Sequence, residues 1–262
     1  MMNILSIHTD SLLSHDRKRA LRALSALAEI ISPQSVAFER EAVTYVPHLL
    51  ALALNRKTVA QAELISYLSN VHDSALWAWR RNQESCAPDE SFEYNEMVAW
   101  ENSVAASYEN SAPAAMALLE GTVDARVRGA TIQLASRLKS CRASLTSMLP
   151  QMFSETDEAG LKVDIIEALA QAGITLAPDE ETSTSTYEWV NGRRRSETPG
   201  VRLGATLSLL PRVDPVLQES LKESAMRSSD EERAAALEAM WLHERTIEWA
   251  TRRSVRPTRY LA

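Results

Sequence analysis

Glycine is scarce in this chain, and the scarcity limits the folds that the chain can adopt. The 262 residues include seven glycines and three phenylalanines, with few runs of β-branched residues. Sandwiches and barrels use glycine at their tight turns, and phosphate-binding loops use it where the backbone approaches an anion. The composition therefore argues against these folds and predicts a chain built from helices.

Cysteine and long apolar runs are scarce as well. Two cysteines, Cys86 and Cys141, are too few for a disulfide framework and fit a reducing compartment. The first ten residues lack a basic segment followed by a long apolar one, so they do not predict a secretory signal. The longest apolar run, 46–54, contains Pro47 and His48 and is too short to cross a bilayer. These features predict a cytoplasmic protein without a membrane partner.

Positive charge is in deficit, and familiar catalytic patterns are missing from the sequence. The formal net charge is −7 at pH 7, which disfavours direct nucleic-acid binding because phosphate contacts require a basic surface. The five histidines and two cysteines do not have the spacing of metal ligands. The sequence contains no nucleophile elbow, P-loop or dinucleotide fingerprint. We therefore predict a non-enzymatic protein, with no catalytic, cofactor or metal residues.

What the chain does contain is a series of amphipathic segments, several of which begin with a basic residue. Apolar residues at helical spacing predict helices over 16–31, 39–54, 58–71, 73–81, 91–108, 113–119, 124–138, 142–153, 157–172, 199–210, 214–227 and 230–245. Four basic residues near helix starts, Arg128, Lys162, Arg202 and Arg233, are 34, 40 and 31 positions apart. A period of about 30–45 residues carried by helices is typical of a repeat array. Such arrays stack helix pairs into a solenoid.

The segment that begins Asp124-Ala-Arg-Val-Arg, followed by small residues and then Leu134, resembles the second helix of HEAT and HEAT-like (PBS-lyase-type) repeats. Val201-Arg202-Leu-Gly-Ala follows the same pattern, with Pro199-Gly200 in place of the acidic start. Segments 157–169 and 230–240 match it weakly, whereas 45–50 and 111–119 resemble the first helix of such repeats. The resemblance covers roughly residues 40–245 and depends on recurrence rather than on any single motif.

This resemblance implies an all-α fold, an α-solenoid of stacked antiparallel helical hairpins in a single domain, 1–262. It also implies a role as a binding scaffold, and some bacterial members resemble bilin lyases or toxin-immunity proteins. Small residues after the basic positions, Gly129-Ala130 and Gly204-Ala205, predict close approach of neighbouring helices. The basic residues themselves are interpreted as structural, each pairing with an aspartate of the adjacent repeat, in preference to binding a ligand.

Residues 176–198 interrupt the helical pattern, because they are rich in Thr, Ser and Glu. We interpret them as a polar insertion or flexible loop. Asn191-Gly192 favours a type I′ turn, so 187–190 could alternatively be one strand of a small hairpin. The following Arg193, Arg194 and Arg195 are interpreted as a solvated loop tip. The arginine-rich end, 246–262, is predicted to cap the array.

An acidic stretch is the feature that most suggests a binding surface. Residues 82–125 contain nine acids and no Lys or Arg. We predict that its central part binds a basic partner, through Asp89, Glu90, Glu93, Tyr94, Glu96, Trp100 and Glu101. The alternative interpretation is a solvated face with helix-terminal acids, and with Trp100 packed in the core.

Together these observations predict a protein-binding solenoid with a basic protein partner. The more specific interpretation is a bacterial immunity-type protein that masks a basic toxin such as a nuclease, because opposite fields speed association. A generic regulatory or assembly scaffold is the first alternative. The second, from the enzyme class, is a bilin-lyase-like chromophore transfer that uses cysteine or acidic residues without a recognisable motif.

Overall fold

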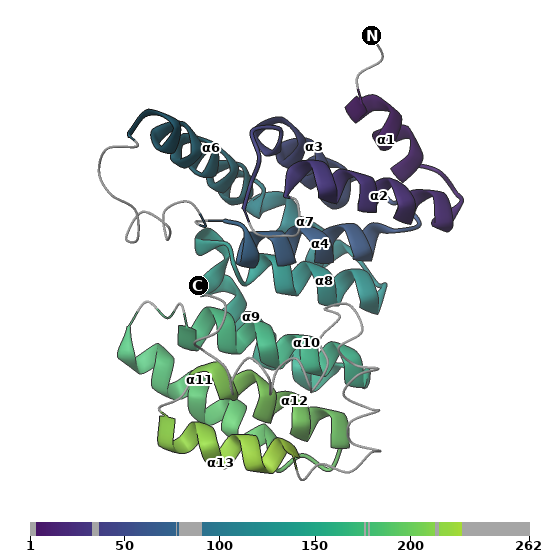
Figure 1. Cartoon of the computed structure of the whole chain (residues 1–262). Coiled ribbons are helices and arrows are strands. Elements are labelled where there is room, and N and C mark those ends of the chain that lie inside the picture. The colour runs from purple at the N-terminus through teal and green to yellow at the C-terminus, as the bar shows by residue number, and fades with distance from the viewer. Residues whose placement is uncertain are drawn as a thin grey trace. The chain divides into compact units, whose positions relative to one another are not determined.

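The computed structural model describes residues 4–32, 37–76, 78, 91–175, 177, 179–212 and 215–226 (Figure 1). Every regular element within these ranges is a helix, so the all-α prediction is confirmed for the described chain. The chain divides into two compact units, Met1–Thr122 and Val123–Ala262. A single domain over 1–262 stays a prediction. The predicted helix 230–245 and the cap 246–262 lie outside the described residues.

Unit 1 is organised around helix α3. Its helices are α1 (Ile4–Leu12), α2 (Arg17–Ile31), α3 (Ala42–Asn55), α4 (Gln61–Ser74), α6 (Ser91–Asn110) and α7 (Ala112–Gly121). Helix α3 contacts α2, α4, α6 and α7, whereas α1 packs on α2. Val46 and Leu49 of α3 are fully buried, as are Leu64 and Leu68 of α4. Apolar residues of the predicted helices 39–54 and 58–71 therefore contribute to the core of this unit.

Local sequence explains where the helices of unit 1 begin and how they are joined. The Asp16 carboxylate accepts hydrogen bonds from the backbone N–H groups of Lys18 at 2.9 Å and Arg19 at 3.3 Å, which caps α2.

The Tyr108 hydroxyl of α6 donates to the Leu68 carbonyl of α4 at 2.7 Å. The Tyr108 ring also meets His72 edge to face, with 5.0 Å between ring centroids. These contacts connect two helices that are distant in sequence.

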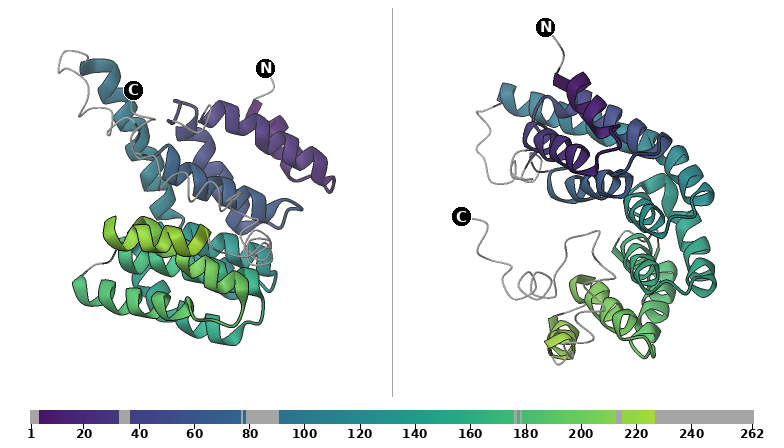
Figure 2. Two further views of the ribbon diagram at one scale, coloured as in Figure 1. Left: turned by 60° about the horizontal axis from the view of Figure 1, so that its bottom comes forward. Right: turned by 90° about the vertical axis from the view of Figure 1, so that its right-hand side faces the viewer.

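Unit 2 is organised around helix α10. Its elements are α8 (Ala125–Ala135), the 3-10 turn η2 (Lys139–Cys141), α9 (Arg142–Glu155), α10 (Ala159–Ala170), the π-helical turn η3 (Gln171–Thr175), α11 (Glu180–Arg193), α12 (Pro199–Leu209), the 3-10 turn η4 (Leu210–Arg212) and α13 (Pro215–Met226). Helix α10 packs against both α8 and α12. Helix α9 lies against α10, and α11 lies against α12 (Figure 2).

Close approach of neighbouring helices in unit 2 depends on glycine, as the sequence predicts. A Cβ atom on Gly204 of α12 would lie 2.9 Å from Cγ1 and 3.0 Å from Cγ2 of Val163 in α10. A Cβ atom on Gly129 of α8 would overlap the carboxylate of Asp164 in α10. The buried Gln133 of α8 donates to the Asp164 carbonyl at 2.9 Å, which also joins these two helices. The prediction about the small residues at 129 and 204 is confirmed.

The interpretation of 176–198 as a loop or a β-hairpin is wrong, because residues 180–193 form helix α11. The Asp179 carboxylate accepts a hydrogen bond from the Thr182 backbone N–H at 2.7 Å, and this bond lowers the pKa of Asp179. Thr186 and Val190, one turn apart, are buried against the rest of unit 2. Asn191-Gly192 lies in the last helical turn instead of in a β-turn. Packing of a narrow apolar face thus outweighs the polar composition.

Candidate functional site

The predicted partner-binding residues are only partly assembled by the structure. Those within α6 are Glu93, Tyr94, Glu96, Trp100 and Glu101. Glu96 is exposed, whereas Tyr94 and Trp100 are half-buried. Asp89 and Glu90 lie outside the described residues.

Glu101 does not belong to an exposed acidic surface. Its side chain is 0% exposed, and the residue lies one and two turns from Val104 and Tyr108, which are also buried. Because Glu101 shares the packed face of α6, a partner cannot reach its carboxylate in the folded protein. The prediction that Glu101 contacts a partner is therefore wrong, because its side chain is part of the interior of unit 1.

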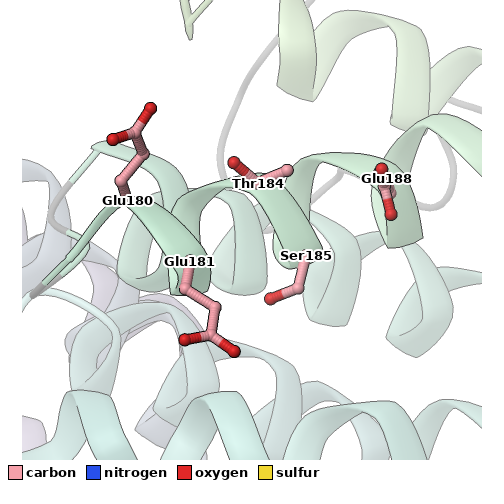
Figure 3. Close-up of a pocket in the computed structure, with 5 residues that line it drawn as sticks. All are labelled: Glu180, Glu181, Thr184, Ser185 and Glu188. Atoms are coloured by element: carbon pink, nitrogen blue, oxygen red, sulfur yellow. The ribbon is translucent and has the colours of Figure 1, made fainter.

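A second set of acidic residues lies on the exposed face of α11. The residues Glu180, Glu181, Thr184, Ser185 and Glu188 are all exposed and line an open hollow of about 430 Å³ (Figure 3). We call these five residues the α11 acidic face. They contribute three carboxylates and two hydroxyls, and no cation is among them. Figure 3 shows their side chains projecting from successive turns of one helix.

Helical spacing explains this arrangement. Glu180, Thr184 and Glu188 are each four residues apart, and Glu181 and Ser185 form a parallel row beside them. Helix-terminal position favours the first two glutamates, since negative charge is stabilised near a helix N-terminus. Glu188 lies beyond the first turn and lacks that benefit. In Figure 3 the carboxylates of Glu180 and Glu181 point away from each other, so they are not arranged to share a proton.

The C-terminal end of α11 has a different character. The Arg193 guanidinium lies 4.0 Å from the centroid of the Trp189 ring and 5.1 Å from that of Phe153, a residue of α9. The two rings meet edge to face at 5.2 Å, and the Lys162 ammonium group of α10 lies 5.4 Å from the Phe153 centroid. We call Phe153, Lys162, Trp189 and Arg193 the cation–aromatic cluster. Partial burial lowers the pKa of Arg193.

These positions correct two expectations about basic residues. Arg193 belongs to the last turn of α11 and packs on two aromatic rings, so it is not a solvated loop tip. Lys162 forms no ion pair with an aspartate of the described residues. Arg202 does have a structural role, because it donates to the backbone carbonyls of Ser196 and Glu197, both at 2.9 Å, in the turn between α11 and α12.

The described part of the chain contains no group of three or more His, Cys, Asp or Glu residues placed to hold a metal ion. Cys141 is a buried free thiol, whereas Cys86 lies outside the described residues. No described helix combines the length and apolarity needed to span a bilayer.

The glutamates of α11 are absent from the predicted partner-binding residues, because the sequence of 176–198 is interpreted as a polar loop. A helix-start signal was nevertheless present. Asp179 is followed by Glu180 and Glu181, which is the usual order of a capping residue and first-turn acids. With that signal, the spacing of Thr184 and Glu188 would have predicted a polar helical face.

Comparison with known proteins adds no further identification. No protein-family model, no curated protein and no solved structure matches the chain. The resemblance to HEAT-like repeats therefore stays a prediction from the sequence.

Proposed function

We propose that this protein is a non-enzymatic binding module that takes a basic protein partner on the α11 acidic face. The observation that carries the proposal is the exposure of Glu180, Glu181 and Glu188 on one side of a packed helix, with no cation among the described residues that line the hollow. An exposed surface of one charge sign attracts partners of the opposite sign and speeds their association.

The chemistry of this face suits lysine and arginine side chains. Carboxylates accept charge-assisted hydrogen bonds from both, and the hydroxyls of Thr184 and Ser185 offer further acceptors between the glutamates. Helix α11 is also packed against the rest of unit 2 on the side opposite these carboxylates and hydroxyls. Thr186 and Val190 anchor its opposite side, and Asp179 caps its start. A preformed surface loses little conformational entropy when it binds.

We further propose that the helices of unit 2 are HEAT-like hairpins, and that the array extends over roughly 40–245 as a solenoid. The packing of α10 between α8 and α12 supports this, together with the glycines at the two contacts. The pairing of α9 with α10 and of α11 with α12 also fits stacked antiparallel hairpins.

A basic toxin such as a nuclease is one partner that the α11 acidic face fits, which would make the protein immunity-type. A regulatory or assembly scaffold would use the same face for a different basic protein. No described residue favours the bilin-lyase-like alternative, so that activity, like the cytoplasmic location, stays a prediction.

The proposal is tested by removing the three charges without changing side-chain size. We expect the combined variant Glu180→Gln, Glu181→Gln and Glu188→Gln to slow association with the partner by about tenfold and to weaken its salt dependence, because steering by charge acts on the on-rate. The partner is first captured by cross-linking from cells that produce the protein. Surface plasmon resonance at several salt concentrations then measures the rates.

A matched control removes three exposed carboxylates elsewhere, through Glu39→Gln, Glu41→Gln and Glu120→Gln in unit 1. It changes the net charge equally but leaves α11 intact. Circular dichroism verifies that both variants keep their helices, since the first-turn glutamates also contribute about 0.3–1 kcal/mol each to α11. Equal rates for the two variants would show that the α11 acidic face does not bind the partner.

A further inference from the structure

The cation–aromatic cluster combines residues of three helices at one place in unit 2. Phe153 comes from α9, Lys162 from α10, and Trp189 and Arg193 from α11. On α11, Trp189 and Arg193 continue the four-residue spacing of Glu181 and Ser185, so the cluster directly adjoins the α11 acidic face. All four cluster side chains are half-buried and retain an accessible part.

The two cations of the cluster form no ion pair within the part of the chain that the structure describes. No carboxylate of the described residues lies within 4.0 Å of Lys162 or Arg193. The Arg193 Nε atom is buried and has no hydrogen-bond acceptor among the described residues. Two like charges in a partly desolvated setting repel each other, and an anion placed between them would offset that repulsion.

The geometry of a stacked guanidinium says which anion would fit. The Arg193 Cζ atom lies over the Trp189 ring, 4.0 Å from its centroid, and a guanidinium that lies parallel to a ring at this distance directs its N–H groups outward in its own plane. That edge matches the two oxygens of a planar carboxylate, which can accept two parallel hydrogen bonds. The ring faces of Trp189 and Phe153 can contact the methylene groups that carry the carboxylate.

We propose that the cation–aromatic cluster binds the carboxylate of an aspartate or glutamate side chain presented by the protein partner. The inference rests on the proposed function in one respect, namely that the ligand is part of a protein. Arg193 supplies the bidentate contact, and Lys162 supplies the second positive charge. The partner surface would then carry cations opposite the α11 acidic face. It would also carry one acid about 7.5 Å further along, since Arg193 follows Glu188 by five residues at about 1.5 Å per helical residue.

This assignment makes the end of α11 the specific part of the interface. Buried or half-buried Trp and Arg residues dominate the energetics of many protein interfaces, whereas exposed charges act mainly on the association rate. The acidic face would attract a range of basic proteins, and the cluster would select those that also present a correctly spaced acid.

Titration with a small ligand tests the site without the partner. The probe is N-acetyl-glutamate amide, which carries one carboxylate, added to the ¹⁵N-labelled protein at constant ionic strength. We expect the indole N–H signal of Trp189 and the Nε–H signal of Arg193 to shift and to saturate in the millimolar range. Trp189→Phe assigns the indole signal among the six tryptophans of the chain.

Variants decide whether the shift reports the proposed contacts. Arg193→Gln combined with Lys162→Gln should weaken binding at least about fivefold, and Arg193→Lys alone should also weaken it because the planar fork is lost. The control pair Arg195→Gln and Lys57→Gln removes two exposed cations and should bind the probe as the unaltered protein does. If the double glutamine variant is unfolded by circular dichroism, the Arg193→Lys result decides.

Several outcomes would overturn the proposal. These are the absence of a saturable shift, equal weakening by the control pair, and unchanged binding in Arg193→Lys together with the double glutamine variant. Inorganic phosphate is titrated in parallel, and tighter binding of phosphate at the same signals would overturn the assignment to a carboxylate. Failure of the proposed function is a separate result, because loss or retention of the basic partner does not affect binding of this small probe.

Discussion

Substitution of Gly204 should destabilise the protein in proportion to the size of the new side chain. We expect Gly204→Ala to lower the free energy of unfolding by about 1–2 kcal/mol and Gly204→Val by about 3 kcal/mol. A Cβ atom at 204 meets Cγ1 and Cγ2 of Val163 at 2.9 and 3.0 Å, and a β-branched side chain has little freedom to move aside. The gain in helix propensity from Gly to Ala, about 1 kcal/mol, is smaller than the free-energy cost of this overlap. Urea unfolding followed by circular dichroism measures the change.

The same substitutions at Gly192 provide the matched control. No described residue has an atom within 4 Å of a Cβ atom built at this position of α11. We therefore expect Gly192→Ala to raise the free energy of unfolding by up to about 1 kcal/mol, a change of opposite sign. If the free energy of unfolding changes alike at both positions, α12 does not approach α10 as closely as described. The support for stacked hairpins in unit 2 would then be lost.

Charge reversal at Glu101 should destabilise unit 1 strongly. We expect Glu101→Lys to lower the free energy of unfolding by about 3–5 kcal/mol, because it places a longer, charged side chain where a fully buried carboxyl group lies, and the cation must lose its hydration. The new lysine side chain would also lie on the packed side of α6, which carries the buried Val104 and Tyr108. Thermal and urea unfolding of the variant measure the loss, and the near-ultraviolet signal of the tyrosines and tryptophans reports the packing.

Glu96→Lys is the control for this variant, since Glu96 is exposed on the same helix. We expect it to change the free energy of unfolding by no more than about 0.5 kcal/mol. A stable Glu101→Lys protein would contradict the burial of this carboxylate. The contrast matters for any study of α6 as an interface, because reversal of Glu101 would alter the fold as well as a surface charge.

The proposed interface depends on how α11 is seated in unit 2. A Cβ atom on Gly173 of η3 would lie 2.5 Å from Oγ1 of Thr186, so glycine is what lets the buried side of α11 approach this turn. The ring of Trp189 then reaches Phe153 of α9. This packing directs the glutamates outward and brings Arg193 over the two rings. The charge pattern of the interface is thus a consequence of packing in the core of unit 2.

The sequence by itself determined most helices and the close contacts between them. Apolar residues at helical spacing located α2, α4 and α12 to within a few residues, because each helix must bury one continuous face. Small residues at 129 and 204 indicated where two helices approach closely, since a side chain there would overlap the neighbouring helix. Both signals are local, and both can be read without knowledge of the partner helix.

Tertiary structure alone decided the state of α11, the burial of Glu101 and the assembly of the cation–aromatic cluster. The apolar face of α11 is too narrow to outweigh its polar composition until η3 and α12 pack against it. Glutamate side chains are usually exposed on protein surfaces, and only the packing around α6 removes that of Glu101 from solvent. The cluster joins residues 153, 162, 189 and 193 from three helices. Such proximity depends on how the helices pack, which a one-dimensional pattern does not specify.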